Sequence, residues 1–444
     1  MKQKICVMGL GYIGLPTAVM FASHGHEVIG VDVKGDVVEA LNKGETLIEE
    51  PYLDIMVHAV ITSENLKAYR QPKEADVFII AVPTPITKDK KADLSYIEKA
   101  IESILPYLKK GNTVVLESTS PVGTTEDFLV PILEKSGLEI GEELFVGHSP
   151  ERVLPGKILM ELVNNNRIIG GINNKSAEKI RDLYSTFVKG EMYLTTATTA
   201  EMCKLMENTY RDVNIALANE LAIISENVGI NAWEVIELCN KHPRVNLHQP
   251  GPGVGGHCLA VDPWFIIERQ PELARIIKLS REININMPKH MFNRIEEILN
   301  DIKGTKKVTI LGATYKPNID DMRESPIIEL VKLLEEKEYY VSIIEPHVKS
   351  LKYQENDTNN AFKNSDLLVL AVDHDAFKDL SLRDIGSIMN NKRLLDAKNY
   401  YKRTDVEKYG FRYYLLGSDE EIDTSKKQEY LEEVATSYDN FIDI

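Results

Sequence analysis

The sequence has few cysteines, and their positions exclude two common structural roles. Its 444 residues contain four of them, Cys6, Cys203, Cys239 and Cys258, and no two stand in a C-x-x-C pair. This density is too low for a disulfide scaffold, and the spacing is not that of a structural zinc site. We therefore expect a reduced, cytoplasmic protein without a bound metal.

Positive charge and long apolar runs are scarce as well. Lys and Arg number 52 against 68 Asp and Glu, which gives a formal net charge of -16, and no block of basic residues occurs. Nucleic acids and anionic membranes are bound by concentrated basic patches, and a bilayer span needs about 20 consecutive apolar residues. The sequence has neither of these, nor a secretory signal pattern. We expect no nucleic-acid or membrane partner.

What the sequence does contain is an alternation of strand and helix patterns near its start. Buried-strand patterns at residues 4–8 and 28–33 flank a helix expected over 15–23, and two more strands of the same sheet are expected at 76–82 and 113–117. This alternation is typical of a doubly wound, mostly parallel sheet.

The rest of the chain changes pattern twice. Residues 199–240 and 273–302 have the period of helices. A second alternating unit follows, with strands expected at 307–312, 341–345 and 367–372 and a helix over 325–338. From Ser418 the chain is acidic and weakly periodic, so we expect a surface helix or a partly mobile tail without chemistry.

The predicted fold class is therefore α/β, with two Rossmann-like doubly wound domains joined by a central helical domain. The predicted boundaries are 1–195 for the first domain, 196–302 for the central helical domain and 303–444 for the second α/β domain with its acidic tail. A chain of this length is expected to form roughly two to four domains.

A Gly-x-Gly-x-x-Gly segment joins the first strand to the first helix. Gly9 suits the tight turn, Gly11 a close approach of the pyrophosphate, and Gly14 close packing of the helix on the sheet. Asp32, at the end of the second strand, suits the ribose hydroxyls of NAD and repels a 2′-phosphate, although Lys34 nearby leaves NADP open. The alternative is a glycine turn in a flavodoxin-like domain without a dinucleotide.

The stretch Gln249–Asp262 places a thiol directly after several glycines and prolines. Cys258, beside His257 and four residues before Asp262, stands as an exposed nucleophile would. The other three cysteines lie in strand or helix patterns, where a thiol usually serves as a small core residue. A loop thiol that merely packs is the alternative, and the loop alone does not decide between them.

One face of the central helix carries Lys204, Asn208 and Arg211, which stand at i, i+4 and i+7. Such a stripe is most often a solvated face. Asn is a poor helix former, however, and the three residues form no i,i+4 ion pair that would explain them. A lysine here can act in proton transfer or electrostatics, and an asparagine can orient a water.

The second α/β unit lacks the glycine fingerprint. Its first strand ends in Leu311-Gly312-Ala313-Thr314-Tyr315-Lys316. We expect the same sheet edge to bind a different, smaller nucleotide ligand there, as after an internal duplication.

Taken together, these motifs resemble the UDP-glucose/GDP-mannose 6-dehydrogenase family over nearly the entire chain. The matching elements also include Val82-Pro83-Thr84-Pro85, Glu117-Ser118-Thr119, Ser149-Pro150-Glu151-Arg152, Glu201-x-x-Lys204-x-x-x-Asn208, Gly255-Gly256-His257-Cys258 and Tyr315-Lys316-Pro317 through Arg323-Glu324-Ser325-Pro326.

Within that family the residues look most like the branch that acts on UDP-N-acetyl-D-mannosamine. His242-Pro243-Arg244 and the loop before Cys258 carry this likeness. The UDP-glucose branch has Ser before the cysteine and Phe-Leu-Ala-Glu-Gly after Pro-Glu, whereas this chain has His257 and the run Arg152–Gly156. UDP-N-acetylglucosamine and UDP-glucose remain the alternative substrates.

The resemblance implies a four-electron oxidation of the sugar C6 hydroxyl to a carboxylate with two NAD⁺. Cys258 would capture the intermediate aldehyde as a thiohemiacetal, which is oxidised to a thioester and hydrolysed. Lys204 would stabilise the oxyanion, Asn208 and Asp262 would hold water and the lysine, and Glu151 with Thr119 would assist proton transfer. The product would serve surface or capsular polysaccharide synthesis.

The resemblance also implies contact residues and a homodimer in which Arg244 reaches the partner's site. Residues expected at the cofactor are Gly9, Gly11, Tyr12, Ile13, Gly14, Asp32, Thr84, Thr119 and Arg323. Residues expected at the UDP-N-acetylhexosamine are Arg152, Val153, Lys204, Asn208, Arg211, His242, Arg244, Gly255, Tyr315, Lys316 and Lys398.

Two other functions compete with this one. A two-electron dehydrogenase of the 6-phosphogluconate or hydroxyacid type would have no need of Cys258. A regulatory NAD-binding module would be expected to have lost some of the polar positions that the chemistry requires.

Overall fold

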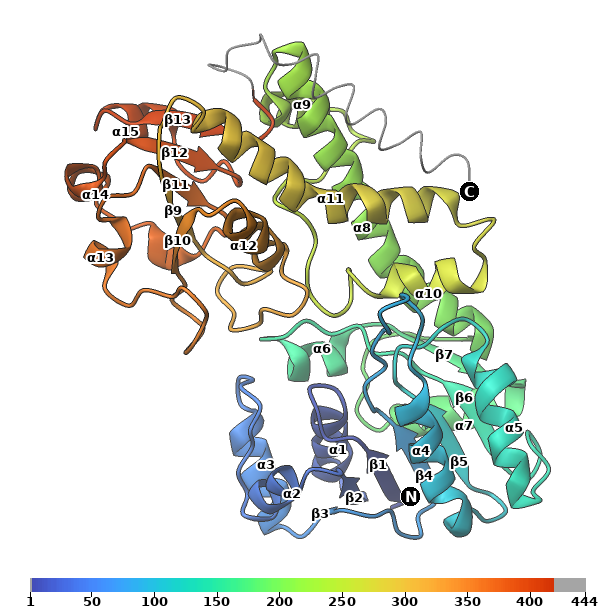
Figure 1. Cartoon of the computed structure of the whole chain (residues 1–444). Coiled ribbons are helices and arrows are strands. Elements are labelled where there is room, and N and C mark those ends of the chain that lie inside the picture. The colour runs from blue at the N-terminus through green and yellow to red at the C-terminus, as the bar shows by residue number, and fades with distance from the viewer. Residues whose placement is uncertain (1, 419–444) are drawn as a thin grey trace. The chain divides into compact units, whose positions relative to one another are not determined.

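The computed structural model describes residues 2–418, which fall into two compact units (Figure 1). Of these residues, the first unit comprises 2–208 and 261–274, and the second comprises 209–260 and 275–418. Each unit is built on its own sheet. The predicted tail after Ser418 lies outside the described residues.

The sheet of the first unit has the strand order β3-β2-β1-β4-β5-β6-β7-β8. Its strands are β1 (Lys4–Met8), β2 (Glu27–Val31), β3 (Leu66–Tyr69), β4 (Val77–Ile80), β5 (Thr113–Leu116), β6 (Phe145–His148), β7 (Arg167–Gly171) and β8 (Met192–Thr196). Strands β1 to β6 run parallel, β7 is antiparallel to β6, and β8 is parallel to β7. The order 3-2-1-4-5-6 is that of dinucleotide-binding folds, whose ligand lies where the order reverses, between β1 and β4.

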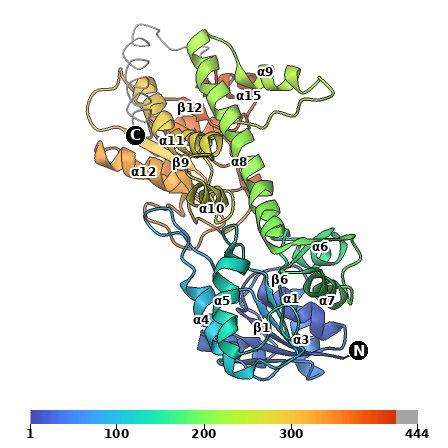
Figure 2. The same ribbon diagram turned by 90° about the vertical axis from the view of Figure 1, so that its right-hand side faces the viewer.

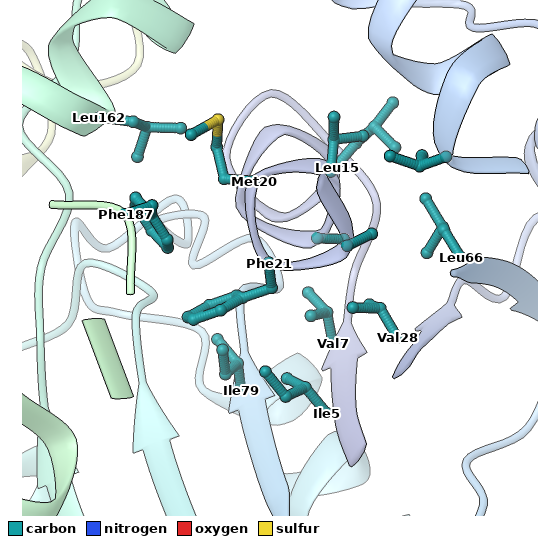
Figure 3. Packing of buried hydrophobic residues seen from close by; sticks show 14 of the residues in the cluster. Ile5, Val7, Leu15, Met20, Phe21, Val28, Leu66, Ile79, Leu162 and Phe187 are labelled. Atoms are coloured by element: carbon teal, nitrogen blue, oxygen red, sulfur yellow. The ribbon is translucent and has the colours of Figure 1, made fainter. Parts of the chain in front are cut away.

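Helices cover both faces of this sheet. The helices of the first unit are α1 (Gly14–Ser23), α2 (Gly35–Asn42), α3 (Leu53–Thr62), α4 (Ser95–Ile104), α5 (Val130–Leu133), α6 (Ile158–Asn164), α7 (Asn174–Tyr184), the π-helical turn η2 (Thr124–Leu129) and α10 (Asp262–Arg269), which lies away from the sheet (Figure 1). Helix α1 is buried from Gly14 to Ala22, as expected for a helix that is apolar all round. Figure 3 shows Phe21 of α1 lying toward Ile5 and Ile79 of the sheet.

The predicted helical section is confirmed, but it is not continuous. Helix α8 (Ala197–Val228) is a single long rod (Figure 2), and it ends where Gly229 adopts φ +76°. Helix α9 (Ala232–Cys239) then starts from an Asn231 cap, and α11 spans Arg275–Ile298. Cys239 at the end of α9 is exposed, so its expected role as a core residue is wrong.

The second sheet is wholly parallel, in the order β10-β9-β11-β12-β13. Its strands are β9 (Lys307–Leu311), β10 (Tyr340–Ile344), β11 (Leu367–Leu370), β12 (Arg393–Asp396) and β13 (Arg412–Leu415), and its helices include α12 (Pro326–Glu336), α13 (Thr358–Phe362), α14 (Leu382–Ile388) and α15 (Arg403–Glu407). This is the 2-1-3-4-5 order of flavodoxin-like folds, with its own reversal between β9 and β11. Two α/β parts and a helical part are thus present, as predicted.

Candidate active site

The glycine-rich turn between β1 and α1 has one face closed by protein and one face open. Gly9 has φ +92°, and a Cβ there would lie 2.6 Å from the Ala81 carbonyl oxygen. A Cβ on Gly14 would lie 1.9 Å from the Gly9 oxygen. A Cβ on Gly11 would meet no described atom within 4 Å. Gly9 and Gly14 are therefore required by packing, whereas Gly11 leaves room for a ligand.

Asp32 is held at the carboxyl end of β2 by two backbone donors. Its Oδ2 accepts from the Leu10 N–H at 3.0 Å and its Oδ1 from the Lys34 N–H at 2.9 Å. The carboxylate is thereby fixed beside the glycine turn, in the position from which such a residue binds an adenosine ribose. Tyr12, at the tip of the turn, is 42% exposed, and Ile13 is half-buried.

Two threonines follow the next strands at the same sheet edge. Thr84 comes after β4, and its Oγ1 is buried without a hydrogen-bond partner among residues 2–418. Thr119 comes after β5 and is half-buried. A buried hydroxyl that lacks a protein partner is suited to a polar group of a bound ligand. The edge between β1 and β4 therefore fits a dinucleotide.

Lys204, Asn208 and Asp262 come together at the junction of α8 and α10. The Asn208 amide donates to Asp262 Oδ2 at 2.6 Å, and Lys204 lies one helical turn before Asn208. Asp262 is 2% exposed. Burial raises the pKa of the Asp262 carboxyl to about 6, while the positive charge of Lys204 and the Asn208 hydrogen bond act to lower it. The predicted helical face is therefore a polar cluster rather than a solvated stripe at these two positions.

Glu151 belongs to a buried ion-pair network that spacing alone did not reveal. Arg167 on β7 donates to Glu151, and also to Glu117 at 2.9 Å. Glu117 accepts a further bond from Tyr184 at 2.6 Å. These groups join the end of β5 to β7 and α7. The sequence alone does not point to Arg167, because its partners Glu151 and Glu117 lie 16 and 50 residues away.

The neighbours of Glu151 are also engaged. Arg152 forms an ion pair with Glu207 of α8 at 2.7 Å and donates to the carbonyl of Asn166. Val153 is half-buried. The pair with Glu207 brings Arg152 to the helix that carries Lys204 and Asn208.

Glu201, one turn before Lys204, anchors α8 to the loop that follows β5. Its carboxylate accepts from the Gly123 N–H at 2.6 Å, the Thr125 N–H at 2.7 Å and the Thr125 hydroxyl at 2.6 Å. Burial raises its pKa to about 7, and the bonds from Thr125 and Gly123 oppose that rise. The loop that carries Thr119 and the helical face that carries Lys204 are thus joined by one buried group, whose role its place in the Glu201-x-x-Lys204 motif does not reveal.

In the second unit, the loop before Cys258 lies directly on Tyr315. A Cβ on Gly255 would lie 2.6 Å from Tyr315 Cβ, and one on Gly256, whose φ is +85°, would lie 2.8 Å from Tyr315 Cε2. The Gly256 N–H donates to the Arg323 carbonyl at 2.9 Å. These glycines are needed because backbone and ring are in contact, and Cys258 follows in a half-buried turn.

Polar groups surround this turn. His257 Nδ1 lies 3.9 Å from Asp321 Oδ2, and the Arg323 guanidinium donates to the same carboxylate at 2.6 Å. A Cβ on Gly251 would lie 3.5 Å from Lys398 Nζ. Loop 250–258 is therefore bordered by Tyr315, Arg323 and Lys398, three of the predicted ligand-binding residues.

The remaining predicted residues of this unit are exposed. Burial, and then the charge of Arg211, lower the pKa of His248, so Arg211 lies near the start of the same loop. His242 Nδ1 accepts from the Arg244 N–H at 3.3 Å, and both residues are exposed. Lys316, next to Tyr315, is exposed as well.

The sheet order, the glycine turn with its acidic partner and the second parallel sheet define the class: a NAD-dependent dehydrogenase with two Rossmann-like domains joined by helices. The chain belongs to the UDP-glucose/GDP-mannose dehydrogenase family. Its NAD binding domain model matches residues 3–188, its central domain model 198–286 and its UDP binding domain model 309–403.

Several proteins with named activities are similar to this chain over most of their length. The chain is 48% identical to a UDP-N-acetyl-D-mannosamine dehydrogenase of Methanococcus maripaludis over 94% of this chain and 97% of that protein. A solved UDP-D-ManNAc dehydrogenase from Pyrococcus horikoshii is 41% identical, with a TM-score of 0.89 over 94% of this chain and all of that one. An NDP-N-acetyl-D-galactosaminuronic acid dehydrogenase of Ralstonia solanacearum is 47% identical over 89% of this chain and 97% of that protein.

Neither a membrane-spanning helix nor a metal-binding cluster occurs in the part of the chain that the structure describes. No helix among them combines the length and the apolar character that crossing a membrane requires. Within residues 2–418, no three His, Cys, Asp or Glu side chains gather so as to hold a metal ion.

Proposed function

We propose that this dehydrogenase oxidises the C6 hydroxyl of UDP-N-acetyl-D-mannosamine to the carboxylate and reduces two NAD⁺ for each sugar. The observation that carries the proposal is Cys258 on a glycine loop against Tyr315, four residues before the Asp262 that pairs with Asn208. That short connection limits the two Cα atoms to about 14 Å apart. The names of the mannosamine relatives support the choice of sugar.

The first oxidation turns the C6 alcohol into an aldehyde. NAD⁺, when bound at the Gly9–Gly14 turn, accepts the hydride in each of the two oxidations. In our proposal Lys204 stabilises the negative charge that develops on the C6 oxygen, and Asp262 with Asn208 holds the lysine and a water in place. The proton of the hydroxyl leaves through this water.

The second oxidation proceeds through the enzyme thiol. The Cys258 Sγ forms a bond to the aldehyde carbon, and the oxygen takes up a proton to give a thiohemiacetal. Loss of a second hydride leaves a thioester. Water then attacks the carbonyl carbon, the C–S bond breaks, and the thiolate and the carboxylate are released. We assign to Glu151 and Thr119 the assistance of water and proton transfer in these steps.

We assign recognition of the UDP-sugar to both units. Arg152, Val153 and Arg211 would contact the sugar or phosphates, and Gly255, Tyr315, Lys316 and Lys398 would contact the UDP part. The presence of a UDP binding domain in this family supports the second group. Arg323 would reach the cofactor.

We also propose a homodimer formed through α8. Tyr210, Leu217 and Ile224 recur every seven residues and are 56%, 49% and 51% exposed, so they form an apolar stripe along one face of the helix. A second copy of the chain would cover this stripe. The exposed His242 and Arg244 would then be free to enter the partner's site.

We also propose a reduced, cytoplasmic location, because four cysteines in 444 residues are too few for a disulfide scaffold. We propose that the uronate product is a precursor of surface or capsular polysaccharide. The cell fraction that holds the enzyme, and the loss of the uronate from cell extracts when the gene is deleted, test these two statements.

The covalent step is tested by Cys258→Ser with a count of NADH per sugar. We expect the wild type to release two NADH and the uronate, and the variant to lose nearly all uronate formation. Rapid production of two NADH by Cys258→Ser would overturn covalent catalysis. Release of a single NADH by the wild type would favour a two-electron dehydrogenase. No absorbance change with any nucleotide sugar would favour a binding module.

The sugar is tested by a panel of UDP-sugars. The Ralstonia relative, at 47% identity, is named for N-acetylgalactosaminuronic acid, so overall sequence identity does not determine which sugar epimer is the substrate. We expect the highest kcat/KM with UDP-N-acetylmannosamine, and lower values with UDP-N-acetylglucosamine, UDP-N-acetylgalactosamine and UDP-glucose. A higher kcat/KM for any of these three would replace the proposed substrate.

A further inference from the structure

The second unit repeats the backbone geometry of the glycine turn in the first. Gly312 follows β9 with φ +86°, as Gly9 follows β1 with φ +92°. The Gly312 N–H donates to the Ile344 carbonyl at 2.9 Å, and the Gly9 N–H donates to the Val31 carbonyl at 2.8 Å. Both turns are therefore tied in the same way to the second strand of their sheet.

The equivalence extends to the acidic residue after that strand. Glu345 follows β10 as Asp32 follows β2, and its Oε2 accepts from the Ala313 N–H at 2.7 Å, just as Asp32 accepts from Leu10. Its Oε1 accepts from the N–H two residues later at 2.9 Å, which Asp32 also does. Glu345 is therefore the counterpart of the ribose-binding Asp32.

The two acids differ in what they face. Asp32 is half-buried, but Glu345 is 4% exposed and lies 3.1 Å from Nε2 of the fully buried His374. His374 stands four residues after the end of β11, where the first unit has Thr84 after β4. In the second unit the imidazole of His374 thus bonds to the acid, whereas the equivalent position of the first unit holds the Thr84 hydroxyl.

The hydrogen bonds fix the protonation of His374. The Asn318 N–H donates to its Nδ1 at 2.9 Å, so Nδ1 is the acceptor and the proton is on Nε2. Nε2–H then donates to Glu345. Burial acts to raise the pKa of Glu345, but the bonds from His374, Ala313 and His347 hold it below its usual value.

The pair holds both ends of one loop. Glu345 accepts from the N–H groups of Ala313 and Thr314, and His374 accepts from that of Asn318. Between these anchors stand Tyr315 and Lys316, and the Tyr315 ring contacts the backbone of the loop that precedes Cys258.

We propose that Glu345 and His374 are positioning residues for the UDP-sugar site, a role that rests on the proposed function. Asp32 is proposed to bind a ribose in the first unit, whereas its counterpart Glu345, together with His374, holds residues 313–318 in the second. We call this arrangement the clamp. This clamp sets Tyr315 and Lys316 for the uridine nucleotide. Because Glu345 is already occupied by His374, the second unit binds UDP but not a second dinucleotide.

The test compares two buried histidines that each face a glutamate. His374→Ala removes the clamp. His290→Ala is the matched control, since His290 of α11 lies 2.9 Å from Glu226 of α8 in the same unit. For each variant we would measure UDP and NAD⁺ affinity by calorimetry, KM for both substrates, the melting temperature and amide hydrogen exchange.

We expect His374→Ala to raise the Kd for UDP and the KM for the UDP-sugar about tenfold, the equivalent of one hydrogen bond to a charged group. The NAD⁺ affinity should stay within about twofold, and exchange should accelerate in residues 313–318. His290→Ala should lower the melting temperature without these changes. Equal weakening of UDP and NAD⁺, or unchanged UDP affinity in His374→Ala, would overturn the proposal.

A second variant tests the proposal if His374→Ala does not fold. His374→Gln keeps a donor for Glu345 but loses the acceptor for Asn318, so we expect a Kd for UDP about threefold higher and faster exchange near Asn318. Unchanged values in this variant would overturn the clamp. If the wild type oxidises no UDP-sugar, the proposed function fails, whereas UDP affinity and loop exchange still decide the role of the pair.

Discussion

At the scale of single residues, Asp262 combines burial with two groups that favour its charge. Its neighbours Asn208 and Lys204 oppose the effect of burial, which leaves its pKa at about 6. Because this value is above the ordinary one for Asp, protonation of Asp262 stabilises the fold, and its contribution to stability falls as the pH rises toward 6. A loss of activity below pH 6 is therefore not explained by unfolding through this group.

We predict that kcat falls as the pH drops through about 6, since the proposed mechanism uses ionised Asp262. Asn208→Ala removes a hydrogen bond to the charged form, so the fall should begin at a higher pH. Asn214→Ala, on the same helix with its amide bonded to the Tyr210 carbonyl, is the control and should leave the profile in place. An acidic limb that does not move in Asn208→Ala would contradict this role of Asp262.

The residue types and their spacing predicted part of the polar cluster around Asp262. Lys204 and Asn208 stand one turn apart on a helix, and the structure joins Asn208 to Asp262 as the motifs indicated. Arg167 could not be found in this way, because Glu117 lies 50 residues from it and only folding of the sheet brings the two together. Cys239 was misjudged because apolar neighbours in sequence do not fix which face of a short helix is covered.

At the scale of elements, the glycines of the turn between β1 and α1 differ in role, since Gly14 is required by packing and Gly11 leaves room for the ligand. Gly14→Ala should destabilise the first unit, because its Cβ would overlap the Gly9 carbonyl. Gly11→Ala should keep the melting temperature but raise the KM for NAD⁺ about tenfold or more, since its Cβ points into open space where the pyrophosphate binds. Thermal melts with NAD⁺ titrations check both, and an unchanged KM in Gly11→Ala would contradict the assignment.

The anchor of α8 can be tested independently of the cofactor. Glu201→Gln replaces one of the two carboxylate oxygens by an NH₂ group, so at least one of the three donors of Gly123 and Thr125 loses its acceptor, and we predict a loss of about 1–3 kcal/mol in the free energy of unfolding. Glu220→Gln, at an exposed position of the same helix, should change the free energy by less than about 0.5 kcal/mol. Denaturant unfolding of both variants makes the comparison, and equal losses would contradict the anchor.

Two of the strands that the sequence did not predict lack the pattern of a buried strand. Strand β7 ends in two glycines, and β8 is largely exposed, so neither has the apolar run that marks a buried strand. By contrast β1, β4 and β5 are buried at nearly every position, and their patterns were plain. The long helical section was predicted, but its break at Gly229 was not, because a single glycine is tolerated within many helices.

At the scale of the whole molecule, the two units repeat one turn geometry, and we propose that an internal duplication gave one chain two nucleotide sites of different kinds. The second unit keeps the turn, the acid and their backbone bonds but lacks the glycine fingerprint, so the sequence indicated a related domain without revealing that Glu345 replaces Asp32. In our proposal the second unit binds UDP rather than a dinucleotide because Glu345 is bonded to His374.

The proposed dimer gives the last prediction. If Arg244 enters the partner's site, Arg244→Ala and Cys258→Ser are each inactive alone, but a mixed dimer holds one site with an intact Cys258 and an intact Arg244. Random mixing makes half of the dimers hybrid, so we expect about one quarter of wild-type activity to return after the variants are co-refolded. Leu217→Glu with Ile224→Glu, which charges the exposed stripe of α8, should give monomers by light scattering and abolish that recovery. No recovery from stable mixed dimers would show that each site uses its own Arg244.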